Sequence, residues 1–137
     1  MMSGARRICI AIVLAVSAAD SVGAEPIPPE MVGIWATEDA VMRGTLLFEG
    51  QALYLGVDGV AAWIAGPPPI GVQMQCSYEP QLSTVNCITI ETDGRGHSGR
   101  IPYDATSNRF VVDDRPLIRR FDEFDDKSRR ALGVSPN

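Results

Sequence analysis

The one histidine of the chain lies beside a serine in a glycine-rich segment, residues 94–100. Ser98 lacks the Gly-x-Ser-x-Gly setting of a hydrolase nucleophile, because position 100 is an arginine. In an extended segment the neighbouring His97 points away from Ser98, whereas serine catalysis needs the two side chains to meet in space. The segment is therefore typical of a hairpin loop, and we predict that the protein is not an enzyme.

Metal chemistry has little support in the residue pattern. Asp93 and His97 could share a metal ion, but one histidine without a thiolate supplies too few ligands for a closed zinc site. The carboxylates are spread over many turns and offer no preferred acid–base pair. We therefore predict no catalytic residue, no metal site and no cofactor.

The first 24 residues have the layout of an export signal. Arg6 and Arg7 form a basic start, residues 8–19 are an apolar run, and Val22-Gly23-Ala24 presents the small side chains that a signal peptidase accepts. The run is shorter than the roughly 20 residues that cross a bilayer, and Asp20 ends it. We predict a signal peptide over residues 1–24 and a periplasmic or secreted protein without a membrane span after cleavage.

The remaining residues, 25–137, are enough for a single domain with a modest core. This part carries ten basic and sixteen acidic residues, and no basic cluster outside the C-terminal tail. Phosphate binding needs a concentrated positive surface. The composition therefore excludes nucleic acid and anionic membranes as main partners.

Cys76 and Cys87 are the two cysteines that remain after cleavage, since Cys9 lies in the signal. In an oxidising compartment a close pair of cysteines favours a disulfide over a metal site or a nucleophile. Closing a loop of this length stabilises a domain by roughly 3 kcal/mol in the chain-entropy model.

Between residues 31 and 121 the chain repeats short apolar or alternating runs separated by turn residues. Asp58-Gly59 is the clearest hairpin signal and predicts a type I′ turn. The pattern predicts an all-β, antiparallel meander of eight or nine strands, closed as a barrel, with a β-sandwich as the alternative. The predicted strands are 31–36, 45–48, 52–57, 60–65, 70–78, 84–90, 99–103, 109–112 and 116–121.

The strands that carry the cysteines present a conflict. Alternation places Cys76 on the core face, whereas Cys87 lies on the face opposite to Ile88 and Ile90. A directly opposed disulfide must lie on one face. We expect either a bulge near Asn86, which we favour, or a strand that is buried on both faces.

The tail, residues 122–133, has acids first, bases last and a glycine at its end, an order that suits a short helix. We expect Phe121, Phe124 and Leu132 to be its apolar contacts. A solvated closing helix is favoured over a charged recognition tail.

Gly33-Ile34-Trp35, at the start of the first predicted strand, resembles the Gly-x-Trp motif of lipocalins and related calycins. In those families the tryptophan closes one end of an up-and-down barrel, and a basic residue of the last strand packs on it. The resemblance implies a lipocalin-like barrel in which Arg119 or Arg120 packs on Trp35.

The same motif is similar to that of the bacterial periplasmic inhibitors of secreted metalloproteinases. In that family the segment before the first strand enters the protease cleft. The resemblance implies an inhibitory arm here, whose prolines would hold it extended. Its residues would be Glu25, Pro26, Ile27, Pro28 and Pro29.

Trp63 lies in an apolar run with no alternation, residues 60–65. This favours a strand buried on both faces over the rim of an apolar pocket. The small side chains of Ala61 and Ala65 would leave room beside Trp63 for a ligand. We predict an exported, non-catalytic binding protein of lipocalin-like type for a small apolar ligand or a protein, with a periplasmic protease inhibitor as the alternative.

Overall fold

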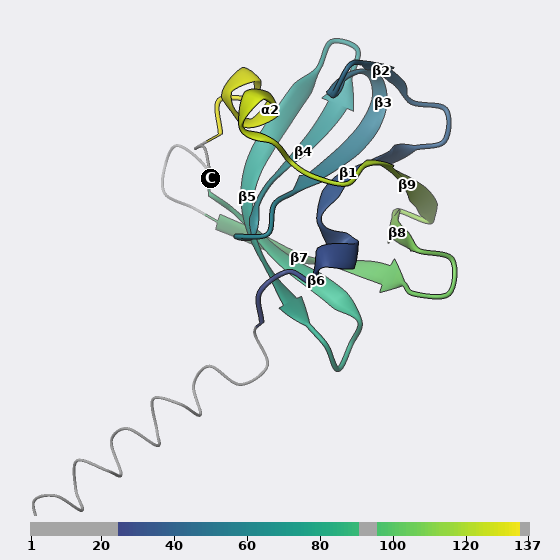
Figure 1. Ribbon diagram of the computed structural model, residues 1–137, viewed down its shortest axis with the longest axis vertical. Coiled ribbons are helices and arrows are strands. Elements are labelled where there is room, and N and C mark those ends of the chain that lie inside the picture. The colour runs from purple at the N-terminus through teal and green to yellow at the C-terminus, as the bar shows by residue number, and fades with distance from the viewer. Residues whose placement is uncertain (1–24, 91–95, 135–137) are drawn as a thin grey trace, which may run out of the picture.

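The structure is a computed structural model that describes residues 25–90 and 96–134 (Figure 1). The predicted signal peptide and Asp93 lie outside these residues. Within them no helix is long and apolar enough to cross a membrane. The elements are η1 (Pro29–Met31), β1 (Gly33–Thr37), β2 (Val41–Arg43), β3 (Leu46–Leu55), β4 (Val60–Gly66), β5 (Ile70–Glu79), β6 (Thr84–Ile90), β7 (Gly96–Asp104), β8 (Arg109–Val112), β9 (Arg115–Phe121) and α2 (Asp126–Ala131).

The strands form an antiparallel meander that closes on itself (Figure 1). Each strand from β3 to β9 pairs with the next, and β1 pairs with both β9 and β3. Eight strands therefore make a closed barrel, and β2 is an additional strand beside β3. The predicted barrel is confirmed, and the sandwich is not the fold.

The chain passes through Gly50 without leaving the sheet. We predicted two strands at 45–48 and 52–57, but the structure has one, β3, with Gly50 at a φ of 107°. Glycine adopts this backbone conformation without a steric cost, so the ladder continues through a bend. The first part of β3 pairs with β2, a strand that was not predicted, and the last part of β3 pairs with β1.

The hairpin turns place positive φ angles at glycines and also at the non-glycine residues Asn108, Asp113 and Asp114. At the predicted type I′ turn only Gly59 has a positive φ, of 83°, so that prediction is wrong. The loop has four residues and is closed by hydrogen bonds from Gly56 N to Val60 O and from Gly59 N to Gly56 O. Two consecutive positive φ angles occur instead at Asp113 and Asp114, between β8 and β9.

The barrel wall separates two apolar clusters. The inner cluster fills the barrel, and its largest fully buried members are Trp35, Phe110, Met31, Leu53, Leu55 and Leu117. The outer cluster lies on the other face of β1, β3 and β4 and includes Ile34, Tyr54, Ile64, Phe124 and Val134. Strand β4 is thus covered on both faces, as its unbroken apolar run predicted.

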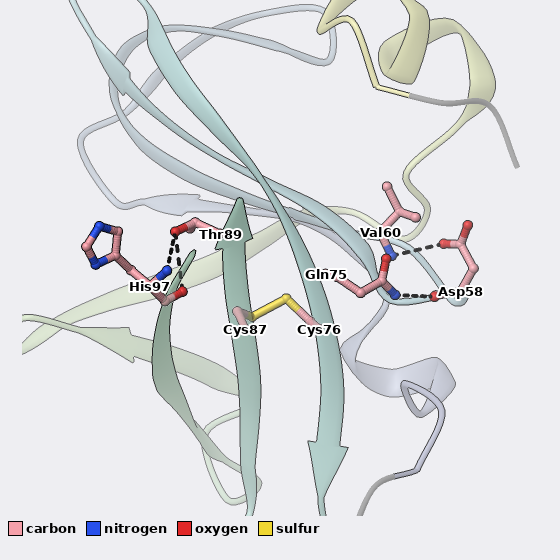
Figure 2. Close-up of a disulfide and its surroundings, with 7 residues drawn as sticks. All are labelled: Asp58, Val60, Gln75, Cys76, Cys87, Thr89 and His97. Atoms are coloured by element: carbon pink, nitrogen blue, oxygen red, sulfur yellow. Dashed lines mark hydrogen bonds between the residues drawn. A yellow bond between two sulfur atoms is a disulfide. The ribbon is translucent and has the colours of Figure 1, made fainter. Parts of the chain in front are cut away.

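Cys76 and Cys87 form a disulfide and face each other directly in the β5–β6 register (Figure 2). The pairing runs from Met74 to Glu79 without a shift, so the predicted bulge is absent. The strand is not buried on both faces either, because Ile88 is 45% exposed on the outside. The alternation was correct, and the error was to assume that Ile88 must be buried.

Helix α2 is shorter than the predicted tail helix. It starts after Asp125, whose side chain accepts a hydrogen bond from Ser128 N, as an N-cap does. Phe124 is buried against the barrel, whereas Phe121 is 37% exposed. Unlike a solvated helix, α2 buries a charged residue, Arg129.

Candidate functional site

Trp35 is fully buried at the centre of the inner cluster. Its ring meets Phe110 and Tyr103 edge-on, at centroid distances of 4.8 and 6.1 Å. The indole Nε1 donates a hydrogen bond to Met31 O at 2.9 Å, which ties the turn η1 to β1. We call Trp35, Tyr103 and Phe110 the Trp35 cluster; edge-on contacts of this kind stabilise beyond the area that they bury.

Arg119 lies beside this cluster. Its guanidinium carbon is 5.7 Å from the centre of the Trp35 ring, a distance at which a cation and an indole attract each other. Its Nε donates to Val32 O and one terminal nitrogen donates to Pro29 O, both at 3.1 Å. Arg119 therefore also holds the chain segment that precedes β1.

Arg120, the second candidate, is directed to a different part of the chain. It donates to the carbonyl oxygens of Thr37 and Glu38, at 2.9 and 3.2 Å. Gly33 adopts a φ of 143°, and a Cβ there would collide with Phe121 O. The geometry thus places Gly33 and Arg119 around Trp35 and gives Arg120 another set of partners.

The five residues of the predicted inhibitory arm run along the barrel. Glu25 pairs with Tyr78 through two backbone hydrogen bonds, of 3.0 and 2.9 Å. Ile27 is only 2% exposed and belongs to the inner cluster, while Pro26 and Pro29 are exposed. The arm is thus part of the folded domain.

A pocket of about 240 Å³ lies on the inner side of β5, β6 and β7. We call it the β7 pocket and define it by its lining residues Met74, Cys87, Thr89, His97, Ser98, Gly99, Arg100 and Ile101. The register places six of these positions on one face, all but Ser98 and Arg100: Met74, Thr89 and His97 form one row, and Cys87 and Gly99 form the next. The lining joins apolar residues with the polar side chains of Thr89, His97, Ser98 and Arg100.

The pocket exists because β8 is short. Within the described residues β8 pairs with β7 only at Tyr103 and Asp104, so residues 96–102 pair with β6 alone. His97 and Gly99 point to the inside of the sheet and are nevertheless exposed. In a completely filled barrel, inward-facing positions would be buried.

Gly99 marks the vacant part of this wall. It lies directly opposite Cys87, on the inward face, and a Cβ built on it would meet no atom within 4 Å. Glycine inside a strand commonly marks a close approach of a ligand or another backbone. Gly99 can be read from the sequence, within the segment predicted to be a hairpin loop. Only the strand register shows that it lies in a strand, opposite Cys87.

Trp63, Ala61 and Ala65 also lie on the inner side of the barrel. Trp63 is half-buried against the inner cluster and pairs with Leu53, while Ala61 pairs with Leu55. None of the three is among the residues that line the β7 pocket. The structure therefore places these small and large side chains next to one another but not around that pocket.

His97 and Ser98 take opposite sides of β7, as expected for an extended segment. His97 faces Thr89, whose hydroxyl accepts a bond from His97 N and donates to His97 O, both at 3.3 Å. In Figure 2 the imidazole is directed away from the disulfide. Among the described residues no group of three or more His, Cys, Asp or Glu side chains could hold a metal ion.

The sequence did not reveal the ion pair between Asp58 and Arg129. Arg129 is fully buried and donates to both carboxylate oxygens of Asp58, at 2.8 and 3.1 Å. Its guanidinium also lies 4.9 Å from the Phe124 ring centre, and its Nε donates to Phe124 O. The hydrogen bonds from Arg129 lower the pKa of Asp58 below its ordinary value.

The buried tyrosines offer no acid–base chemistry near neutral pH. Burial raises the pKa of Tyr54 and of Tyr103 above the ordinary value for a phenol. Tyr54 uses its hydroxyl to donate to Thr45 O at 2.6 Å and to accept from Leu47 N. Both phenols therefore remain protonated and serve the packing.

Comparisons with family models, with curated proteins and with solved structures found no match to this chain. The class of protein rests on the fold alone, which is a closed antiparallel β-barrel with an extra strand and a short C-terminal helix.

Proposed function

We propose that this chain is an exported, non-catalytic binding protein of lipocalin-like type, which takes a small apolar ligand in the β7 pocket. The observation that carries the proposal is the inward-facing Gly99, which stands over open space beside a buried disulfide. Because Gly99 is exposed and has open space above it, a ligand can approach the backbone of β7 at this position, which a side chain would prevent.

The chemistry of the pocket defines the ligand class. Met74, Ile101 and Cys87 present carbon and sulfur, while the polar side chains of Thr89, His97, Ser98 and Arg100 at the pocket can orient a ligand. Binding sites for small molecules combine such apolar walls with a few polar groups. A volume of about 240 Å³ is just below the usual range for drug-sized ligands, so the ligand should be small and mostly apolar.

The inhibitor hypothesis is not the function that we propose, because of the contacts of the arm. An arm that enters a protease cleft must leave the barrel, which would expose Ile27 and break the Glu25–Tyr78 pairing. A disulfide, together with the acidic composition, fits a soluble role outside the reducing cytoplasm.

The test is a titration with N-phenyl-1-naphthylamine, a neutral dye whose fluorescence rises in apolar surroundings. Wild-type protein should bind it saturably, and Gly99→Phe should weaken binding by at least about tenfold, which corresponds to 1.4 kcal/mol. Since nothing lies within 4 Å of the added Cβ, the variant should fold with the stability of the wild type.

The matched control is Ala105→Phe, which places the same ring on the exposed β7–β8 turn. It should leave dye binding unchanged. Saturable binding that Gly99→Phe does not weaken would move the ligand away from the β7 pocket, and a wild-type protein that fails to bind the dye would contradict the proposed function.

A further inference from the structure

A second recess lies outside the barrel, between the outer face of β3 and β4 and the end of α2. Figure 1 shows α2 next to the β4 and β5 side of the barrel. The recess has a volume of about 360 Å³. We call it the outer groove; Gly71, Val72 and Gln73 at the start of β5 also line it, and its other lining residues include Leu47, Ala62, Ile64, Ala131, Leu132 and Val134.

The C-terminal wall of the outer groove is fixed in place. The buried guanidinium of Arg129 holds α2 to Asp58 on the β3–β4 loop through two hydrogen bonds. The hydroxyls of Ser128 and Thr45 are 2.6 Å apart and join the helix to the start of β3. A groove between walls that are already positioned requires little ordering when a ligand binds.

The lining of the groove indicates what it can hold. Among the described residues that line it, none carries a charged side chain, and Gln73 is the one with a polar side chain. A charged group placed against this surface would lose hydration without gaining a partner, which is costly. The complementary ligand is a neutral hydrocarbon chain with one hydrogen-bonding end for Gln73.

The shape of the groove argues against a flat protein partner. A stable interface takes about 800 Å² from each chain. Here the apolar floor is recessed between a helix end and a sheet: Ile64 and Val134 are only 7% and 5% exposed, while the rim carries exposed side chains such as Val72. A narrow recess of this volume suits one small molecule.

We propose that the outer groove binds one neutral, single-chain amphiphile, such as a medium-chain alcohol, as a site separate from the β7 pocket. The two sites lie on opposite faces of the barrel wall, since Ile64 belongs to the outer cluster and Met74 to the inner cluster. The proposal therefore does not depend on the proposed function.

The experiment follows backbone amide shifts by NMR while 1-decanol is added to the mature protein. Saturable shifts are expected at Ile64, Leu132 and Val134. Ala131→Trp, which fills the groove from an exposed position, should weaken binding by about tenfold or more. The control Ala105→Trp should bind like the wild type, and so should Gly99→Phe.

Two charged analogues of the same chain length, decanoate and decyltrimethylammonium, should each bind at least about tenfold more weakly than decanol. Equal binding of all three would overturn the neutral-ligand proposal, as would shifts confined to β7 or an Ala131→Trp variant that binds normally. A concentration-dependent dimer that Ala131→Trp dissociates would assign the groove to a second copy. Binding only to phosphatidylcholine vesicles would assign it to a membrane surface, and both results reject the proposal.

Discussion

The inner face of the barrel is packed around Trp35 and vacant beside Gly99. In the Trp35 cluster three aromatic rings meet and Arg119 fastens the preceding chain segment above them. In the β7 pocket, an inward-facing position carries no side chain and the neighbouring strand β8 is missing over most of β7. The difference teaches that tight packing in one part of a small barrel can accompany an unfilled wall in another part of the same sheet.

The largest loss of stability should follow the removal of a side chain from the Trp35 cluster. Trp35→Ala removes a fully buried indole, and the cavity should lower the free energy of unfolding by about 3–5 kcal/mol. Urea denaturation followed by circular dichroism measures this loss. If Trp35→Ala lowered the free energy of unfolding no more than Gly99→Phe does, the Trp35 cluster would not be the part of the barrel that supplies stability.

The disulfide should come next, because it closes the loop between β5 and β6 beneath the vacant wall. Its two cysteines are separated by 11 positions, and reduction should lower the free energy of unfolding by about 3 kcal/mol. Native protein should show no free thiol at these positions. Complete thiol labelling of unreduced, folded protein would contradict this prediction.

Asp58 lies on the outer side of the barrel, and Asp58→Asn should lower the free energy of unfolding by an intermediate amount. The substitution retains the shape but removes a charged acceptor, and it should cost about 2 kcal/mol at pH 7. The pKa of Asp58 is lower in the folded protein than its ordinary value of 3.8. Its contribution is therefore present above pH 3.8 and is lost as the pH falls below that value.

The pH dependence gives the control for this variant. Between pH 7 and pH 3 the wild type should lose more stability than Asp58→Asn, because the variant no longer has this carboxyl to protonate. Urea midpoints of the two proteins at both pH values measure the difference. Parallel losses would show that the Arg129 pair does not stabilise the fold.

The smallest effect is the coupling between Trp35 and Arg119. In a double-mutant cycle with Trp35→Phe, Arg119→Met should show an interaction of about 0.5–2 kcal/mol. Arg120→Met should show almost none, because Arg120 bonds to Thr37 and Glu38. Equal coupling for both arginines would remove the distinction that the geometry draws between them.

Local pattern was enough to predict the meander of strands, because alternation and turn residues act over a few neighbours. Strand β8, Arg109–Val112, and the start of β4 at Val60 fall where they were predicted. The bend at Gly50 and the turn at Asp113 and Asp114 were missed, because the sequence does not show which residues adopt a positive φ.

The sequence by itself determined the composition of the barrel: the cysteine pair, the Gly-Ile-Trp start and the apolar run around Trp63 are local features of the chain. Tertiary structure decided which of two arginines meets Trp35, that Arg129 is buried against Asp58, and that Gly99 faces a vacant wall. These outcomes depend on strand register and on the length of a neighbouring strand. Both are set by packing between residues far apart in the chain, which no local pattern encodes.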